Sequence, residues 1–268
     1  MLAGLMIGVN ILLSGIAYLM KHLTLNGAIA AAIIGSLIWI GGGFYAWGLL
    51  GVFFVTSSFW SSYKDERKYH LYHLHEKGGQ RDVIQVMANG GIAAFCCLSY
   101  LISGQFCFLL GTAVSIAAAT ADTWASEIGV LSSKPPRSLL TMKPIKTGMS
   151  GGVSLLGTLS QIAGSSLIAI LSLIGLKLFY KLPMEGLTVF MLISGMGVLG
   201  SIIDSLLGAY VQAKYECRIC QIVTERLYHH GVKTKLIKGI PFMTNDIVNL
   251  LSNVVVVMLS ILCYQIWT

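Results

Sequence analysis

Long apolar segments are the feature that most constrains how this chain can fold. They recur along its 268 residues, and each is roughly 17–25 residues long, the length that a helix needs to cross ~30 Å of hydrocarbon. Only 11% of the residues are charged, against about 25% in a soluble domain. The sequence therefore predicts an all-α, multi-pass transmembrane helical bundle. It excludes a soluble enzyme, a disordered chain, a nucleic-acid-binding surface and a disulfide scaffold.

The apolar segments predict eight spans, which form a single integral membrane domain over residues 1–268 because no linker separates two units. The second and third spans meet at Gly41-Gly42-Gly43. These two could instead form a broken or re-entrant pair, so we expect seven or eight spans. The predicted spans are 2–20, 25–40, 44–60, 83–103, 105–128, 150–178, 187–212 and 247–267.

The basic residues predict the orientation in the membrane. Loops 61–82, 129–149 and 213–246 hold 15 of the 18 Lys and Arg residues. Two spans separate each loop from the next, so all three fall on one side, which the positive-inside rule makes cytoplasmic. We expect a protein of a bacterial cytoplasmic membrane whose active site opens on the cytoplasmic side. The net charge of +7 then needs no nucleic-acid partner.

Four carboxylates lie in or at the ends of apolar segments, near the basic loops. A charged carboxylate inside hydrocarbon costs at least ~2.5 kcal/mol, so it persists only when it is paired, bound to an ion or facing a wet cavity. The alternative for any one of them is a structural hydrogen bond between helices. We expect the four to converge on one shallow site, as catalytic and metal-binding groups: Asp122, Glu127, Asp204 and Asp246.

Helix periodicity adds detail to this site. Asp246, Asn249 and Asn253 follow an i, i+3, i+7 stripe, which should face the bundle interior. Glu127 is displaced by about 140° from Asp122 on an ideal helix. It would need an unwound turn or a neighbouring helix to meet Asp122.

Several carboxylates and carboxamides at one helix-end site suit Mg²⁺, a hard ion that takes oxygen ligands. Basic residues precede two glycine-rich words, Asn89-Gly90-Gly91 and Ser150-Gly151-Gly152. A glycine-rich turn that opens a helix can hold phosphate on its backbone N–H groups. The same glycines could be only a turn signal, and the basic residues could only contact lipid headgroups. The candidate phosphate-binding cations are Arg81, Lys143 and Lys146.

A Cys-x-x-Cys pair, Cys217 and Cys220, lies in the third basic loop, with His229 and His230 beyond it. Two thiolates and one or two imidazoles could bind Zn²⁺. The spacing is irregular and adjacent histidines are awkward ligands, so free thiols are the alternative.

Five motifs occur in one order along the chain, and together they resemble the integral membrane family of plant phytyl-phosphate kinase with its uncharacterised prokaryotic and animal relatives. Two residues depart from the family pattern. Ser150 stands where relatives usually have Asn, and His229-His230-Gly231 replaces a usual His-Cys-Gly. The motifs begin at Gly79, Ala121, Ser150, Asp204 and Asn245, and Asp122-Thr-Trp-Ala-Ser-Glu127 is the most specific segment.

The resemblance implies a Mg²⁺-dependent kinase that transfers a phosphoryl group from a nucleoside triphosphate, with CTP expected, to an isoprenyl monophosphate lipid such as phytyl or geranylgeranyl phosphate. The four carboxylates are then the metal-binding candidates, and the prenyl tail lies between helices. The runner-up is a transporter or flippase for an anionic or phosphorylated lipid, which would need polar groups near the midplane. The remaining candidates for binding substrate or phosphate are Arg81, Asn89, Lys143, Lys146, Ser150, Gly151, Gly152, Asn245 and Asn249.

Overall fold

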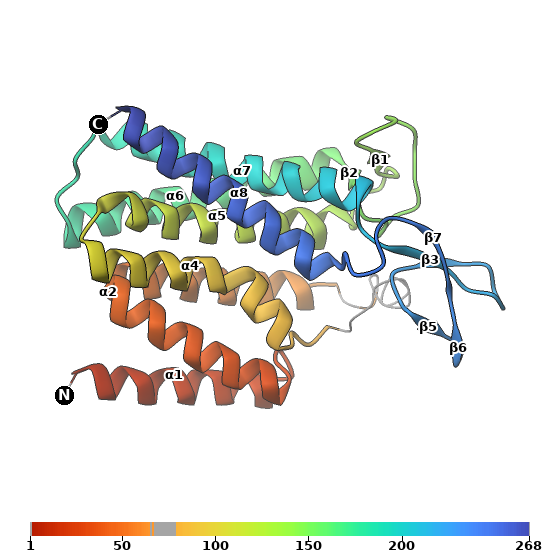
Figure 1. Cartoon of the computed structure of the whole chain (residues 1–268), viewed down its shortest axis with the longest axis horizontal. Coiled ribbons are helices and arrows are strands. Elements are labelled where there is room, and N and C mark those ends of the chain that lie inside the picture. Colours follow the sequence, from red (N-terminus) through yellow and green to blue (C-terminus); the bar gives the residue numbers. More distant parts are fainter. Residues whose placement is uncertain (1, 65, 67–78, 268) are drawn as a thin grey trace.

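The computed structural model describes residues 2–64, 66 and 79–267, and its helices pack side by side as one bundle (Figure 1). The predicted multi-pass helical fold is confirmed. Within the described residues the helices are α1 (Leu2–Leu19), α2 (Leu25–Ser62), α4 (Val83–Ser103), α5 (Phe106–Gly129), α6 (Leu155–Phe179), α7 (Gly186–Tyr210) and α8 (Asn245–Trp267).

Six of these described helices are long and apolar enough to cross a membrane, namely α2 and α4 to α8. Helix α1 has a shorter apolar stretch, Gly4–Leu19. The two predicted spans 25–40 and 44–60 both fall within α2, a single element of 38 residues.

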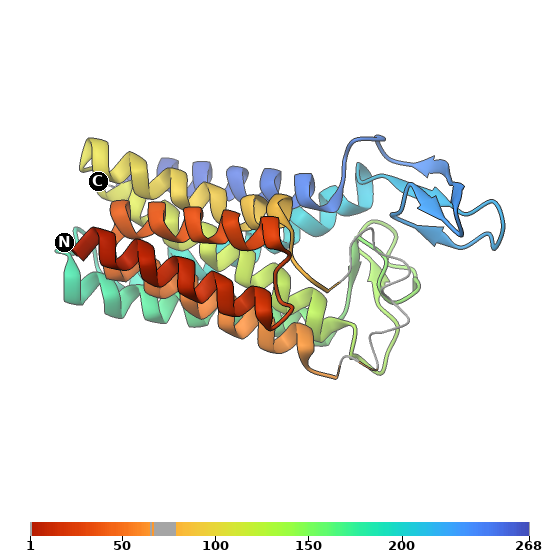
Figure 2. The same ribbon diagram turned by 90° about the horizontal axis from the view of Figure 1, so that it is seen from below.

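Helix α2 reverses its direction inside its own length. Its start and its end both contact Arg81: Thr24 N donates to the Arg81 carbonyl (3.0 Å), and Arg81 Nη1 donates to Ser58 Oγ (3.4 Å). A straight helix of this length would separate its ends by ~57 Å. The reversal occurs at Gly43, whose φ of 58° and ψ of −155° are essentially restricted to glycine. The predicted break is therefore present, and 25–42 and 44–62 are two antiparallel segments (Figure 2).

Helix α5 forms the centre of the bundle. Its residues from Cys107 to Ala121 are buried, apart from Phe108, and it contacts α2, α4, α6, α7 and α8. Small side chains such as Ala113, Ala117 and Ala121 let neighbouring backbones approach closely, which is how helices pack in lipid. The carboxyl end of this central helix carries Asp122 and Glu127 to one end of the bundle.

Short strands occupy the loops at that same end (Figures 1 and 2). The apolar pattern does not predict them, because each pairs only two to four residues. Strand β1 pairs with β2, β3 pairs with both β4 and β7, and β5 pairs with β6, all antiparallel. Their bounds are β1 (Arg137–Ser138), β2 (Gly152–Val153), β3 (Lys214–Glu216), β4 (Val223–Thr224), β5 (Tyr228–His229), β6 (Val232–Lys233) and β7 (Lys235–Lys238).

The described parts of the three basic loops lie together at this end, as the parity of the spans predicts. Helix α1 begins and helix α8 ends at the opposite end (Figure 1). Three of the basic residues counted above, Arg67, Lys68 and Lys77, lie outside the described residues.

Candidate functional site

A polar cavity of about 360 Å³ lies where the strand-bearing loops meet the helices. Ligand pockets commonly measure ~300–1,000 Å³. Its walls come from one end of each of α2, α4, α5, α6, α7 and α8, from the turn that precedes α6, and from residues of the adjoining loops, Gln212 and Glu225 among them. The lining includes all but two of the residues that the sequence proposes for Mg²⁺ or phosphate: Asp122, Glu127, Asp204, Asp246, Arg81, Asn89, Ser150, Gly151, Gly152, Asn245 and Asn249.

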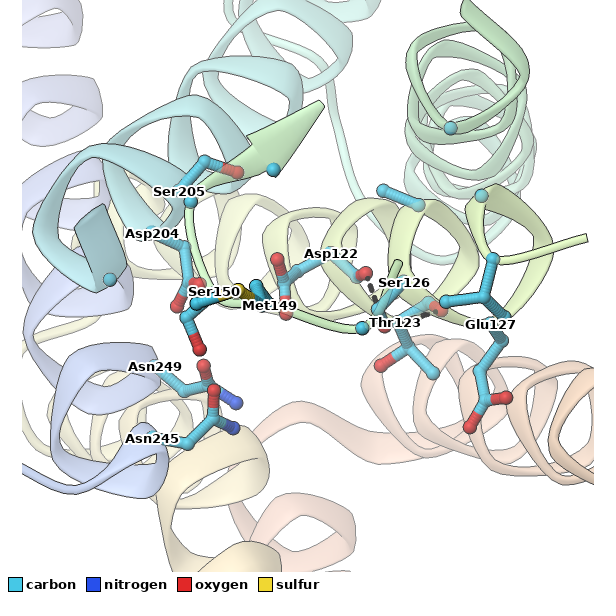
Figure 3. A pocket seen from close by; sticks show the side chains of 18 of the residues that line it. Asp122, Thr123, Ser126, Glu127, Met149, Ser150, Asp204, Ser205, Asn245 and Asn249 are labelled. Atoms are coloured by element: carbon cyan, nitrogen blue, oxygen red, sulfur yellow. Dashed lines mark hydrogen bonds between the residues drawn. The ribbon is translucent and has the colours of Figure 1, made fainter. Parts of the chain in front are cut away.

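Asp122 on α5 and Asp204 on α7 lie on one side of the cavity, with Ser150 close to them (Figure 3). Each carboxylate accepts a long hydrogen bond from a serine. Ser201 Oγ donates to Asp122 Oδ1 and Ser252 Oγ donates to Asp204 Oδ2, both at 3.4 Å. Two carboxylates in one hollow repel each other, so they favour a bound cation.

The start of α8 supplies carboxamides to the same side of the cavity. In the amide orientation that satisfies both groups, the Asn249 side chain donates to Asp204 Oδ2 (2.6 Å) and to the Asn245 carbonyl (3.2 Å). Asp246 in the first turn is only 3% exposed. Asn253, the next member of the stripe, donates to the Ser115 carbonyl (3.3 Å) and lies deeper in the bundle.

Glu127 lies on the other side of the cavity from this group. Helix α5 continues to Gly129 without unwinding, so the Glu127 side chain points away from Asp122 (Figure 3). It accepts a hydrogen bond from Ser61 Oγ on α2 (2.8 Å). Glu127 therefore contacts the neighbouring helix α2 and does not meet Asp122.

Arg81 is the one basic side chain among the described residues that line the cavity. Its guanidinium lies 5.9 Å from the Phe53 ring centroid and 5.7 Å from that of Phe54. Burial lowers the pKa of Arg81, and the negative charge of Glu127 opposes that shift. Because an Arg remains charged in proteins, this position presents a fixed cation to an anionic ligand.

The turn before α6 has the geometry of an anion cradle. Gly148 and Gly151 have φ of 85° and 80°. Within the described part of the chain, the backbone N–H groups of Ser150 and Gly151 donate to no protein acceptor. A Cβ at Gly151 would lie 2.4 Å from Ala209 Cβ, so only glycine fits against α7. Free amides in such a turn can bind phosphate oxygens.

The other glycine-rich segment lies inside a helix and not at its start. Asn89-Gly90-Gly91 lies inside α4, whose N-cap is Asp82, so its amides are committed to helical hydrogen bonds. The expectation that this word opens a helix is wrong, because the capping box of Asp82 and Gln85 starts the helix earlier. The Asn89 side chain still lines the cavity and donates to the Gln85 carbonyl (2.9 Å).

Lys143 and Lys146 are exposed and do not line the cavity. Both lie in the connection between β1 and β2, which carries them outward. The predicted span 150–178 starts too early. Residues 152–153 form β2, and α6 begins only at Leu155, after its N-cap Ser154.

A loop cluster that the sequence analysis missed adjoins the cradle. The Glu225 carboxylate accepts hydrogen bonds from Ser150 Oγ and from Gln212 Nε2, the latter at 2.8 Å. Lys214 Nζ donates to the Ser150 carbonyl (2.8 Å). Burial, followed by the nearby positive charge of Lys238, lowers the pKa of Lys214. No periodicity marks these residues, because the loop 211–244 folds back onto the cavity through contacts far apart in the sequence.

The Cys-x-x-Cys pair lies between strands β3 and β4 and does not line the cavity. Cys217, Cys220 and His229 place one possible ligand atom each within 4.8 Å of one another. His230, the fourth candidate, is exposed and is not in this cluster.

The helical bundle and its polar cavity define the class of protein. It is a polytopic helical membrane protein whose cavity, at one end of the bundle, is lined by carboxylates, carboxamides and, among the described residues, one arginine. The chain belongs to the integral membrane protein family DUF92, whose model matches residues 8–257.

Several curated relatives have similar sequences over much of the chain. Protein PGR of Arabidopsis thaliana is 32% identical over 262 residues, which cover 88% of this chain and 87% of that protein. Protein VTE6, chloroplastic, of the same plant is 27% identical over 263 residues, 94% of this chain and 70% of that protein. An uncharacterized membrane protein of Methanocaldococcus jannaschii is 32% identical over 134 residues, 50% of this chain and 52% of that protein. No solved structure matches the chain significantly.

Proposed function

We propose that this protein is a membrane-embedded kinase that transfers a phosphoryl group from a nucleoside triphosphate, with CTP the expected donor, to a prenyl monophosphate, giving the diphosphate. Distant similarity to VTE6 and the motif resemblance to the phytyl-phosphate kinase family support this assignment. The single observation that carries it is a pair of adjoining cavities, one polar and one apolar.

The apolar cavity, of about 130 Å³, lies among α1, α2 and α4. Three residues line both cavities: Arg81, Gln85 and Asn89. At the far end, Trp47 Nε1 donates to Asn10 Oδ1 (2.9 Å), so these two polar groups satisfy each other. An apolar space whose lining includes Arg81 suits an amphiphile with a hydrocarbon tail and an anionic head. A water-soluble substrate would need only the polar cavity.

The proposed reaction joins two anions. An oxygen of the prenyl monophosphate attacks the γ-phosphorus, the bond between that phosphorus and the bridging oxygen breaks, and the nucleoside diphosphate leaves. The attacking oxygen is already ionised at neutral pH, so a general base is not required. Catalysis then depends on positioning and on neutralising charge. Arg81 and the amides of Ser150 and Gly151 would hold phosphate oxygens.

The donor set fits Mg²⁺, because Asp122, Asp204 and Asp246 offer hard oxygen ligands and Asn245 and Asn249 add carboxamide oxygens. When bound, the ion would offset the charge that builds up on the transferring phosphates. Glu127 is assigned a positioning role, because it accepts from Ser61 and its charge acts on Arg81.

The proposed site faces the cytoplasm. The basic loops and both cradle glycines lie at the same end of the bundle, and nucleoside triphosphates are cytoplasmic. The far-end connections, near Gly104 and 180–185, contribute no residue to the described lining of the polar cavity. That distribution favours a one-sided enzyme over a transporter or flippase, which would need access from both ends.

The test is purified protein in detergent with Mg²⁺, CTP or ATP, and a panel of prenyl monophosphates that differ in tail length. We expect a prenyl diphosphate and stoichiometric nucleoside diphosphate, both abolished by EDTA and restored by Mg²⁺. The same preparation in liposomes measures lipid flipping without nucleotide. Flipping with no diphosphate formed from any acceptor would replace the kinase proposal with the transporter.

A further inference from the structure

We propose that Cys217, Cys220 and His229 bind one structural Zn²⁺ that fixes the loop 211–244 against the phosphate cradle. This inference concerns a metal site separate from the proposed Mg²⁺ cavity, and it does not depend on the kinase activity. Three observations carry it: the ligand geometry, the two turns that present the ligands, and the position of Glu225 between them.

One pair of ligand atoms already lies at the separation expected in a zinc site, and the third ligand atom lies nearby. Tetrahedral bonds of about 2.3 Å to sulfur and about 2.0 Å to nitrogen place those two atoms roughly 3.5 Å apart. Cys220 Sγ lies 3.5 Å from His229 Nδ1, and the Cys217 sulfur completes a cluster within 4.8 Å. Ile219 N donates to Cys217 Sγ (3.4 Å), a hydrogen bond that stabilises a thiolate ligand.

Two hairpin turns present these ligands to each other. Cys217 and Cys220 lie in the turn between β3 and β4, which Gln221 closes with a φ of 55°. His229 ends β5, and His230 and Gly231 form the two-residue turn to β6, both with positive φ. His230 in this turn is exposed, and its ring lies edge-on against the His229 ring with 4.2 Å between the centroids. Of the two adjacent histidines, His229 is the one in the ligand cluster. The fourth position of a tetrahedral ion is left to solvent.

A redox role fits the pair less well than a metal. Catalytic Cys-x-x-Cys pairs typically lie at a helix N-terminus that stabilises the thiolate. Here the pair lies in a β-hairpin, both thiols are free, and Cys217 is fully buried. Metal binding needs no oxidant, because each thiol only loses its proton when it ligates.

The ion would organise a loop that is too small to have a core of its own. Glu225 follows β4, between Cys220 and His229 in sequence, and accepts hydrogen bonds from Ser150 Oγ and Gln212 Nε2. Joining the two hairpins by a metal restricts the conformations open to Glu225, as structural zinc does in other small folds. The site therefore links the fold of the loop to the shape of the cradle.

Metal content tests the proposal directly. Protein purified in detergent with a non-thiol reductant and no added chelator should carry about one Zn²⁺ per chain by mass spectrometry of the metals. Cys220→Ser and His229→Ala should each lower that content at least tenfold. His230→Ala and Cys263→Ala are the matched controls, a neighbouring imidazole and a distant thiol, and both should retain zinc.

A second measurement uses the wild-type protein, so the proposal stays testable if a variant fails to fold. Wild-type protein stripped of zinc and loaded with Co²⁺ should show thiolate-to-cobalt charge-transfer absorption and the strong visible bands of a tetrahedral ion. Wild-type protein without zinc and without these bands would overturn the proposal, as would full zinc retention in the Cys220→Ser variant. Loss of zinc in His230→Ala would overturn the three-residue ligand set. None of these readouts uses prenyl phosphate or nucleotide, so a failed kinase assay leaves them unaffected.

Discussion

At the scale of single residues, the position of Asp122 and Asp204 decides what the polar cavity can bind. Both carboxylates lie on helices whose other residues are mostly apolar, and their hydrogen bonds from Ser201 and Ser252 are long, at 3.4 Å. Asp204 also accepts a hydrogen bond from Asn249 at 2.6 Å, but these three partners are neutral and do not offset the cost of two carboxylates at the membrane edge. A bound cation would, which is why these two side chains rank first among the proposed Mg²⁺ ligands.

We therefore expect Asp122→Asn and Asp204→Asn each to lower kcat by ~10²-fold or more, because each removes one of the charges that hold the metal. The Mg²⁺ concentration needed for half-maximal activity should rise in both variants. Steady-state kinetics over a Mg²⁺ titration measure both effects. Glu185→Gln at the far end of the bundle removes an exposed carboxylate and is the control. An Asp122→Asn enzyme with unchanged Mg²⁺ dependence would contradict the assignment.

Arg81 gives a second prediction at this scale. Its guanidinium contacts two aromatic rings and Ser58, a geometry that a lysine ammonium does not reproduce. Arg81→Gln should raise KM for the prenyl phosphate by ~10–100-fold, and Arg81→Lys should recover only part of that loss. The comparison of the two variants in KM and kcat is the measurement. Equal KM values in wild type and Arg81→Gln would remove Arg81 from the proposed headgroup site.

The sequence predicts these residues to different degrees, for physical reasons. Asp122, Asp204 and Asp246 stand out because hydrocarbon penalises a carboxylate, and a penalty is visible in the sequence alone. Lys143 and Lys146 precede a glycine-rich segment in the sequence, but they are exposed on a loop and do not line the cavity. Glu225 was missed, because only the folding of its loop onto Ser150 gives it a role.

At the scale of elements, helix α2 shows how one glycine sets the path of the chain. Gly41-Gly42-Gly43 predicts a break, and Gly43 provides it through a backbone conformation that other residues avoid. Which of the three glycines turns the chain is not visible in the sequence. It depends on the packing of both α2 segments against α4 and α5.

Gly43→Ala should destabilise the protein by about 1–3 kcal/mol through backbone strain alone. The site has room for the added methyl group, since its nearest neighbour would be Tyr180 Oη at 3.9 Å. Thermal unfolding in detergent, followed by tryptophan fluorescence, should show a Tm lower by several degrees. Gly48→Ala is the matched control: Gly48 lies in the second segment of α2, a Cβ added there would have no atom within 4 Å, and the Tm of this variant should not fall.

At the scale of the whole molecule, two cavities of different chemistry, one polar and one apolar, share the lining residues Arg81, Gln85 and Asn89. The polar cavity follows from features that a sequence reveals, namely basic loops on one side and carboxylates near them. The apolar cavity does not, because it exists only where α1, both segments of α2 and α4 pack with a space between them. Residues 10–23 of α1 and its connection form one wall. In the proposed reaction, the prenyl tail would occupy this space while its phosphate lies at Arg81.

This arrangement predicts that one substitution can lower activity toward a long-chain acceptor without lowering activity toward a short-chain acceptor. Gly51 lines the apolar cavity, and a Cβ added there would have no atom within 4 Å. The Gly51→Leu side chain should fill tail space without displacing the backbone. We expect kcat/KM for a long-chain prenyl monophosphate to fall by ~10–200-fold, the loss typical of a blocked apolar pocket. A short-chain monophosphate, which needs only the headgroup site, should keep its rate.

Gly48→Leu is the control for this experiment, because Gly48 lies three residues away on the same segment, also has open space, and lines neither cavity. It should leave both substrates unaffected. Equal losses for the long and short acceptors in Gly51→Leu would show that the variant damages the headgroup site or the fold instead of the tail site. Unchanged kinetics for the long acceptor would place the tail elsewhere, and the link between the two cavities would then no longer support a lipid substrate.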